Sequence, residues 1–225
     1  MHIGIILDGN RRYARSLAMQ PWKGHELGRG KVEKLVEWSI DLKVNELTLY
    51  AFSLENFGRD KQEVDVLMKI FKEAFGKLEK NIMKNGIRVN FIGRLNLLPE
   101  DLQTLMSDLM RKSAGNNTLT LNIALAYGGR AEIVDAAKKI AEDAAAGKLK
   151  PEDLNEQSFS NYLYLKSEPD IIIRTGAAMR LSNFLPYQST YSELFFLDKM
   201  WPEFEKADLA KCIEEFAQRE RRFGK

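Results

Sequence analysis

Six short apolar runs alternate with longer segments of helical periodicity along this chain, and this alternation limits the fold more than any other feature. Each run is rich in aliphatic and aromatic residues and has the length of a buried strand. Strands are expected at 3–7, 47–52, 87–93, 119–126, 170–173 and 194–197. Helices are expected at 32–40, 64–82, 100–112 and 131–146, and from about residue 206. The sequence therefore predicts an α/β protein: a six-stranded, mostly parallel sheet flanked by helices, in a single domain spanning residues 1–225.

The composition of the 225 residues is that of an ordinary soluble protein. The net charge is only +2, which argues against nucleic acid as a partner and requires any anion site to arise from local clustering. Cys212 is the only cysteine, so an intrachain disulfide is excluded and a reducing, cytoplasmic location is expected. No apolar run reaches the roughly 20 residues of a membrane span, although a peripheral contact with a membrane is compatible with the sequence.

The first predicted strand runs into a turn and then into a strongly basic segment. Asp8-Gly9-Asn10 follows the apolar run, and the arginines Arg11, Arg12 and Arg15 come next. Ligands of open α/β sheets bind at the carboxyl ends of the strands, and a carboxylate beside guanidiniums suits a metal ion and a phosphate group. A surface turn whose aspartate caps a helix explains the same residues equally well.

Polar residues also follow other predicted strands. Right-handed crossovers bring the carboxyl ends of parallel strands to one edge, so these residues are expected to converge there. The arginines expected at this edge are Arg11, Arg12, Arg15, Arg59, Arg130, Arg174 and Arg180, and the carboxylates are Asp8, Glu55 and Glu193. Such a set favours a polyanion together with a hard divalent cation. The sequence lacks a P-loop and the glycine-rich dinucleotide motif, so the usual nucleotide-binding signatures are missing.

The segment from 67 to 83 has a broad apolar stripe. Its members are Leu67, Met68, Ile70, Phe71, Phe75, Leu78, Ile82 and Met83. A stripe at helical spacing commonly faces the protein core, and the alternative is the wall of a tunnel for a long hydrocarbon. A diphosphate group at the sheet edge combined with a hydrocarbon inside the domain indicates a prenyl diphosphate substrate.

Nine motifs, in order along nearly the whole chain, resemble those of the cis-prenyltransferases, the undecaprenyl or dehydrodolichyl diphosphate synthase family. They are I-I-L-D-G-N-R-R-Y-A-R (5–15), G-H-x-x-G (24–28), L-T-L-Y-A-F-S-x-E-N-F-x-R (47–59), L-N-I-A-x-x-Y-G-G-R (121–130), I-I-R-T-G (172–176), R-L-S-N-F-L (180–185), Y-S-E-L-F-F (191–196), W-P-E-F (201–204) and R-E-R-R-F-G (219–224).

The resemblance implies an enzyme that condenses isopentenyl diphosphate with an allylic prenyl diphosphate, releasing diphosphate and forming a cis double bond. The allylic substrate could be dimethylallyl, geranyl, farnesyl or geranylgeranyl diphosphate. It also implies a hydrophobic tunnel, a Mg²⁺ cofactor, a homodimer and a peripheral membrane contact for product release. The family's base is not identified by the sequence, and the released diphosphate itself is one candidate.

The resemblance further implies a role for each matched residue. Asp8 and Glu193 are expected to hold Mg²⁺, and the residues expected to line the allylic diphosphate site are Gly9, Asn10, Arg11, Arg12 and His25. Isopentenyl diphosphate is expected to be bound by Arg174, Arg180 and Ser182. The catalytic set is expected to be Asp8, Ser53, Asn56 and Arg59. Arg222 and Gly224 match a C-terminal motif that reaches into the partner's site in this family.

Three positions depart from the common family pattern. Ala177-Ala178-Met179 replaces a glycine and an acidic residue, Pro21 stands where an arginine usually precedes the Gly-His pair, and 185–188 reads L-P-Y-Q instead of L-x-W-Q. These changes are either neutral or indicate altered acceptor handling, such as branched, lavandulyl-type condensation using dimethylallyl diphosphate as acceptor. A third alternative, a non-catalytic subunit of a heteromeric synthase, is disfavoured because Asp8 and Arg174 are present.

Overall fold

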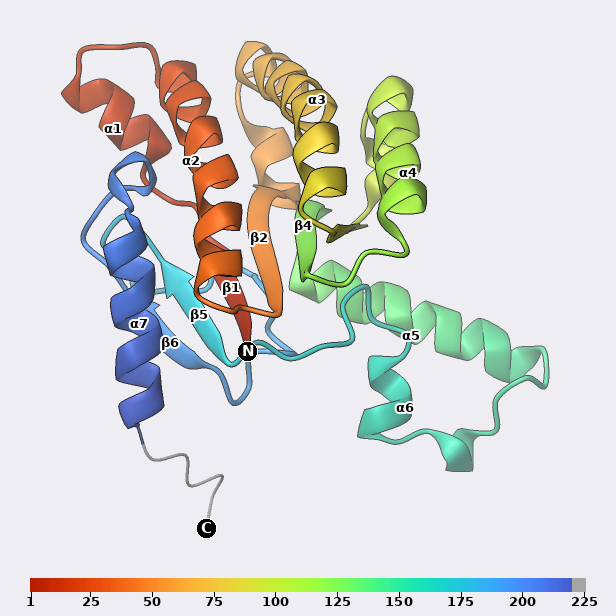
Figure 1. Cartoon of the computed structure of the whole chain (residues 1–225). Coiled ribbons are helices and arrows are strands. Elements are labelled where there is room, and N and C mark those ends of the chain that lie inside the picture. The colour runs from red at the N-terminus through yellow and green to blue at the C-terminus, as the bar shows by residue number, and fades with distance from the viewer. Residues whose placement is uncertain (220–225) are drawn as a thin grey trace.

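The computed structural model describes residues 1–219, and all six predicted strands are present in it (Figure 1). The strands form one sheet in the order β3-β4-β2-β1-β5-β6, and every neighbouring pair is parallel. Their bounds are β1 His2–Ile6, β2 Glu46–Ser53, β3 Ile87–Ile92, β4 Leu119–Tyr127, β5 Ile171–Arg174 and β6 Glu193–Phe196. The predicted sheet is therefore confirmed, and it is entirely rather than mostly parallel.

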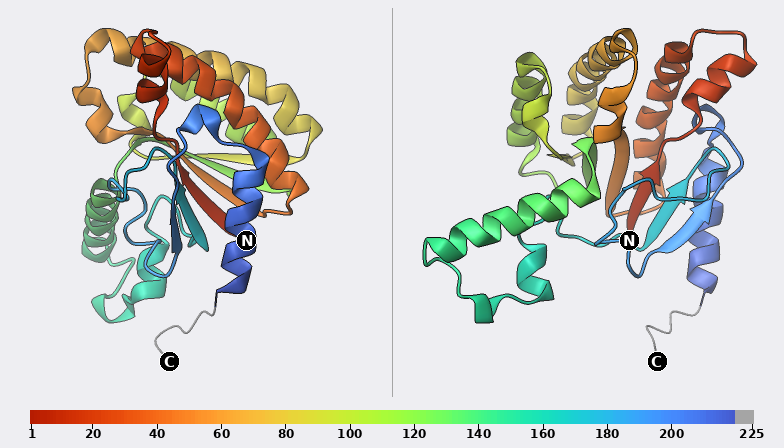
Figure 2. Two further views of the ribbon diagram at one scale, coloured as in Figure 1. Left: turned by 90° about the vertical axis from the view of Figure 1, so that its left-hand side faces the viewer. Right: turned by 180° about the vertical axis from the view of Figure 1, so that it is seen from behind.

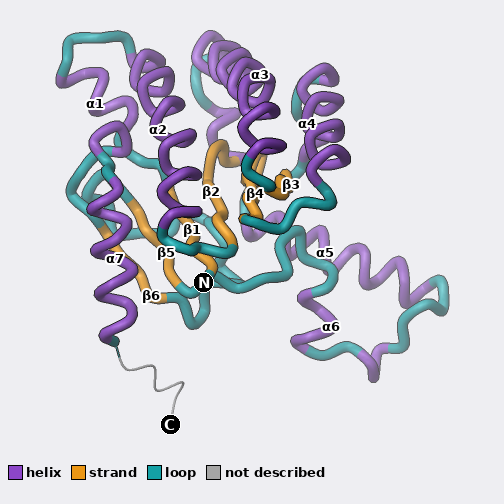
Figure 3. Tube along the Cα trace, in the orientation of Figure 1, coloured by secondary structure: helices purple, strands orange, loops and turns teal. Residues whose placement is uncertain are grey.

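The described part of the chain also contains seven α-helices, of which α7 follows the last strand (Figure 3). They are α1 Asn10–Ser16, α2 Pro21–Asp41, α3 Lys61–Lys84, α4 Glu100–Ser113, α5 Gly129–Ala145, α6 Glu156–Ser160 and α7 Lys206–Gln218. A 3₁₀ turn at Leu54–Gly58 joins β2 to α3.

Helix α2 begins eleven residues before the position expected from apolar periodicity. Pro21 occupies its first turn, where the missing N–H costs nothing. Its first half contains Gly24 and Gly28, which bring α2 so close to α1 that a Cβ at Gly24 would lie 1.9 Å from the Asn10 carbonyl oxygen. Because glycines replace apolar side chains at this contact, the hydrophobic pattern starts only in the second half of the helix.

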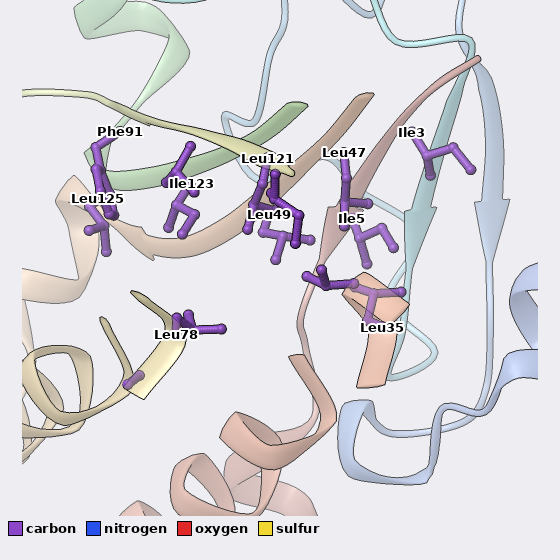
Figure 4. Close-up of a cluster of buried hydrophobic side chains, with 14 of the residues drawn as sticks. Ile3, Ile5, Leu35, Leu47, Leu49, Leu78, Phe91, Leu121, Ile123 and Leu125 are labelled. Atoms are coloured by element: carbon purple, nitrogen blue, oxygen red, sulfur yellow. The ribbon is translucent and has the colours of Figure 1, made fainter. Parts of the chain in front are cut away.

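Helices α2, α3 and α4 lie side by side on one face of the sheet, and α5 and α6 lie on the other (Figures 1 and 2). Alternate strand residues such as Ile3, Ile5 and Leu49 contribute to the larger core, beneath α2 and α3 (Figure 4). A second buried cluster on the opposite face includes Tyr50 and Phe184. The sheet is thus covered by side chains on both faces. Polar side chains are therefore expected at the ends of its strands rather than on its faces.

Cys212 packs in the larger core, and burial raises the pKa of its thiol to about 12. A packing role therefore fits this cysteine. None of the helices in residues 1–219 combines the length and the apolar character needed to cross a bilayer.

Candidate active site

The carboxyl ends of β1, β2 and β5 meet at one end of a cavity of about 620 Å³ that lies between the sheet and helices α2 and α3. The polar residues lining it include Asp8, Asn10, His25, Ser53, Asn56, Arg59, Arg174 and Ser182. These residues come from distant parts of the chain. The predicted convergence of these strand ends is therefore present, and Asp8 and Asn10 line a cavity together with residues from β2 and β5.

The remainder of this cavity is apolar. Its wall on α3 consists of Leu67, Ile70, Phe71, Ala74, Phe75 and Leu78. At about 1.5 Å per residue along a helix, the span from Leu67 to Leu78 is about 16 Å. Leu78 lies opposite Leu49 and Ile123 of the sheet, as Figure 4 shows. Five of the eight stripe residues line the cavity, whereas Ile82 is buried in the core and Met83 is exposed.

A smaller hollow of about 300 Å³ adjoins the polar end of the cavity and shares Asp8, His25 and Arg59 with it. The other charged side chains that line it are those of Arg11, Arg12 and Arg15. This concentration of guanidiniums around one carboxylate is suited to a phosphate-bearing ligand.

Asp8 is held by groups that favour its charged form. Its Oδ2 accepts a hydrogen bond of 2.8 Å from Arg174, and its Oδ1 accepts one of 2.6 Å from the Gly9 N–H. Burial alone would raise the pKa of Asp8, but the hydrogen bond and charge of Arg174, the Gly9 N–H and the charge of Arg12 together hold this pKa below its usual value. Asp8 is therefore a carboxylate at neutral pH.

Glycine is required at the turn after β1. Gly9 has a φ of +107°, and a Cβ there would lie 2.8 Å from the Met200 Cβ. Gly176, at φ +83°, faces the Arg12 side chain, whose Nη2 would be 2.4 Å from a Cβ at that position. Gly9 thus allows close packing against Met200, and Gly176 lets Arg12 approach the backbone of Asp8 closely.

Arg174 is only 4% exposed and fixes the loop that follows β5. Its Nη1 donates to Ser182 Oγ at 2.7 Å and also to the backbone carbonyl of Arg180. Asn183 continues this arrangement, since its Oδ1 accepts from the Arg130 N–H at 2.9 Å and its Nδ2 donates to Glu55 at 3.0 Å. Sequence reasoning missed Asn183, although it lies within the R-L-S-N-F-L motif.

Several buried polar atoms at the site have no hydrogen-bond partner in the structure. They are Asn10 Oδ1, Arg11 Nε, His25 Nε2 and Arg174 Nε. Buried polar atoms are normally paired, so a group of unpaired ones around a cavity is typical of a ligand site.

His25 is neutral at pH 7. Burial is the main cause that lowers its pKa to about 4, and the positive charges of Arg59 and Arg11 lower it further.

Ser53 ends β2 and Asn56 lies in the 3₁₀ turn that follows, and their side chains form a reciprocal cap on this turn. The Ser53 N–H donates to Asn56 Oδ1 at 3.2 Å. Arg59 follows this turn and donates from Nη1 to Glu63 Oε1 at 3.1 Å. Sequence reasoning also missed Glu63, although its spacing of four residues from Arg59 is a detectable signal.

Three predicted site residues lie elsewhere. Glu193 begins β6 in register with Ile171, which is itself paired with Ile3, so it is level with the amino end of β1. At about 3.3 Å per strand residue, that point is about 16 Å from Asp8 along the strand direction. The expectation that Glu193 and Asp8 share one edge within a chain is therefore wrong. Arg180 is exposed and lines neither cavity, and Arg130 is likewise exposed.

Arg222 and Gly224 lie outside the described residues.

Within residues 1–219, no group of three or more histidine, cysteine, aspartate or glutamate side chains could hold a metal ion. A site with one protein carboxylate still fits Mg²⁺, because this ion is commonly held by one or two carboxylates and by the phosphates of the substrate. Asp8 is the residue that fits.

Comparisons with known proteins agree with this geometry. The sequence model of the family described as "Putative undecaprenyl diphosphate synthase" matches residues 6–224. The chain is 51% identical over 228 residues to a Pyrococcus furiosus protein named tritrans,polycis-undecaprenyl-diphosphate synthase (geranylgeranyl-diphosphate specific), a match that covers 100% of this chain and 86% of that protein.

Two solved structures share the fold. Lavandulyl diphosphate synthase from Lavandula x intermedia, in complex with dimethylallyl diphosphate, superposes with a TM-score of 0.96 at 35% identity over 100% of this chain and 98% of that chain. A probable undecaprenyl diphosphate synthase from Campylobacter jejuni superposes with a TM-score of 0.84 at 32% identity, with the same coverage. The chain therefore belongs to the undecaprenyl diphosphate synthase family of cis-prenyltransferases, which condense isopentenyl diphosphate with an allylic prenyl diphosphate.

Proposed function

We propose that this enzyme uses geranylgeranyl diphosphate as its allylic substrate and extends it with isopentenyl diphosphate in the presence of Mg²⁺. The observation that carries the proposal is the arginine-rich hollow that adjoins, through Asp8, His25 and Arg59, a cavity with an apolar wall about 16 Å long. The Pyrococcus furiosus relative, which is named as geranylgeranyl-diphosphate specific, supports this choice of substrate.

The allylic diphosphate binds in the hollow beside Asp8, with its hydrocarbon along α3. Loss of the diphosphate places negative charge on the leaving group, and Arg11, Arg12 and Arg59 stabilise that charge where it develops. Neutral His25 and the Asn10 amide supply uncharged polar contacts. Asp8 would hold Mg²⁺, which would supply further neutralisation of the same charge. No side-chain nucleophile is required, in agreement with the absence of a catalytic triad from the sequence.

Isopentenyl diphosphate binds on the neighbouring side of Asp8, at Arg174 and Ser182. Arg174 is already ordered by Asp8 and Ser182, so its Nε remains available for a phosphate oxygen. Arg180 joins this site by turning inward from its exposed position. Ser53, Asn56 and Arg59 lie between the two diphosphates, near the carbon that is attacked and the proton that is lost. Departure of the diphosphate leaves a positive charge on the allylic carbon, and the apolar wall excludes water from this cation.

The oligomeric state and the location are part of this proposal. Tyr191 and Leu194, beside and within the edge strand β6, are 62% and 38% exposed, which supports a homodimer formed at this edge. The C-terminal residues Arg222 and Gly224 then complete the site of the partner, and Glu193 contributes to Mg²⁺ binding there. The enzyme acts in the cytoplasm and contacts the membrane peripherally to release its lipid product.

Product analysis tests the proposal. The purified enzyme is incubated with isopentenyl diphosphate, Mg²⁺ and each of four allylic diphosphates (dimethylallyl, geranyl, farnesyl and geranylgeranyl), and the products are identified by mass spectrometry. We expect linear cis-polyprenyl diphosphates, with the highest kcat/KM for geranylgeranyl diphosphate. Removal of divalent cations should abolish turnover, and Mg²⁺ should restore it. Absence of any product that depends on the allylic substrate would contradict the proposal and favour a non-catalytic subunit.

One observation favours a second candidate, irregular condensation. Ala177 adopts a left-handed φ of +60°, its N–H donates to the Leu197 carbonyl at 2.8 Å, and nearby Met179 is 81% exposed. The loop beside Arg174 therefore has an alanine in a conformation that favours glycine, and it has no carboxylate from Ala177 to Met179. Incubation with dimethylallyl diphosphate alone distinguishes the two candidates, because only irregular condensation yields a branched product without isopentenyl diphosphate.

A further inference from the structure

Glu63 is a buried carboxylate that lies behind the cations of the site. It is in the first turn of α3 and is 7% exposed. Its Oε1 lies 3.1 Å from Arg59 Nη1, 3.7 Å from Arg11 Nε and 3.8 Å from His25 Nε2. A buried charge is costly unless it is paired, so the two arginines, rather than solvent, hold the carboxylate in place.

The three neighbours of Glu63 come from separate elements. Arg11 belongs to α1 and His25 to α2, and Arg59 precedes α3. All three line the hollow beside Asp8, whereas Glu63 lines neither that hollow nor the larger cavity. Glu63 can therefore act on a bound diphosphate only through these side chains.

The negative charge of Glu63 stabilises the two neighbouring arginines, Arg59 and Arg11. Two guanidiniums near each other repel, and a carboxylate between them offsets that repulsion. Burial lowers the pKa of Arg59, the charge of Glu63 opposes this shift, and the charge of Arg11 adds to it. The carboxylate thus offsets the repulsion between Arg59 and Arg11 and restricts the directions in which their guanidiniums point.

We propose that Glu63 is a positioning residue for the allylic diphosphate site and orders Arg59 and Arg11 before the substrate arrives. Side chains that are already ordered lose less conformational entropy on binding, which strengthens the complex. The identity of the substrate rests on the proposed function, but the anion site itself can be tested with inorganic diphosphate.

Glu63→Gln tests this role because it preserves the size of the side chain and removes its charge. Asp65→Asn is the matched control, since it removes the same charge from an exposed position of the same helix. We expect inorganic diphosphate to bind Glu63→Gln about tenfold more weakly than Asp65→Asn in calorimetric titrations, a factor typical of a hydrogen bond to a charged group. The KM for the allylic diphosphate should rise by a similar factor while the KM for isopentenyl diphosphate is unchanged.

The opposite result has a clear meaning. If Glu63 only competes with the ligand for the arginines, its removal will leave diphosphate binding unchanged or make it tighter, and either outcome overturns the proposal. An equal rise in both KM values indicates a general structural role and overturns it as well.

Glu63→Asp keeps the charge and provides the measurement if Glu63→Gln fails to fold. Relative to Asp65→Asn, we expect it to raise the KM for the allylic substrate, because the shorter side chain moves the carboxylate away from Arg59, and to leave the KM for isopentenyl diphosphate unchanged. An equal rise in both KM values, or no rise in either, overturns the proposal. A parent enzyme that binds diphosphate but forms no prenyl product would contradict the proposed function and leave this inference intact.

Discussion

Arg174 Nη2 lies 2.8 Å from Asp8 Oδ2, so a direct hydrogen bond joins the ends of the adjacent strands β5 and β1. Arg174 is almost completely buried, whereas the Asp8 side chain is 30% exposed. The pair thus connects the proposed isopentenyl diphosphate side of the cavity to the proposed allylic side. Substituting either residue removes a hydrogen-bond partner of the other and so is expected to affect both sides of the cavity.

Asp8→Asn should reduce kcat at least about 100-fold, because removing one preorganised electrostatic contact to the developing charge typically costs this much. The amide oxygen can still accept the hydrogen bond from Arg174, so the variant should fold. Steady-state kinetics and thermal unfolding followed by circular dichroism measure the two effects. Turnover within a few-fold of the parent enzyme would refute the role assigned to Asp8.

Ala74→Leu should shorten the prenyl product, because Ala74 is a small residue in the apolar wall of the cavity. The added side chain fills space between Phe71 and Leu78 that a growing hydrocarbon needs. Overpacking typically costs about 1–3 kcal/mol, so the melting temperature should fall modestly. Mass spectrometry gives the product distribution. Lys77→Leu, on the exposed side of the same helix, is the control and should leave chain length unchanged.

The free energy of unfolding should decrease as the pH falls from about 6.5 to about 4, partly because of His25. The unfolded state binds a proton at this histidine below about pH 6.5, whereas the folded state does not until about pH 4, so acid favours unfolding. One such proton accounts for about 1.4 kcal/mol per pH unit.

His25→Gln should therefore show a shallower pH dependence in urea denaturation over this range. Burial also lowers the pKa of His2, so part of the slope will persist in the variant. An unchanged slope would show that His25 is not held neutral by its surroundings.

Gly129→Ala should destabilise the protein by about 1–3 kcal/mol, as expected for overpacking. A Cβ at this position would lie 2.0 Å from Pro186 Cδ, and the Gly129 N–H donates to the Asn183 carbonyl at 2.8 Å. The strain would displace the loop that carries Ser182 and so raise the KM for isopentenyl diphosphate. Adding Pro186→Ala removes the clashing ring atoms and should recover much of the lost stability. Failure of this second substitution to restore stability would place the cause outside the Gly129–Pro186 contact.

The sequence was sufficient to predict the sheet because its strands are continuous apolar runs, which is the pattern of strands buried on both faces. Right-handed connections then predicted that Asp8, Ser53 and Arg174 would meet. The start of α2 could not be predicted, because Gly24 and Gly28 form a close helix contact without apolar side chains.

Other errors concern where a residue lies within its element. Glu193 is close in sequence to a strand, but it is the first residue of that strand and therefore faces the opposite end of the sheet. Met83 fits the apolar stripe of α3 by spacing, yet it is exposed near the end of the helix. Glu63 has the spacing of an ordinary surface ion pair, and only the packing of α1 and α2 against it makes it buried.

The adjacency of β1 and β5 bears on processivity. Neighbouring strands are about 4.8 Å apart, so in the proposed arrangement the head group of a newly elongated chain shifts by roughly one strand to pass from the Arg174 side of the cavity to the Asp8 side. The hydrocarbon can retreat along the wall formed by α3 during this shift without leaving the protein. If the two diphosphates bind as proposed, the spacing of β1 and β5 thus sets the length of the translocation step between successive rounds of elongation.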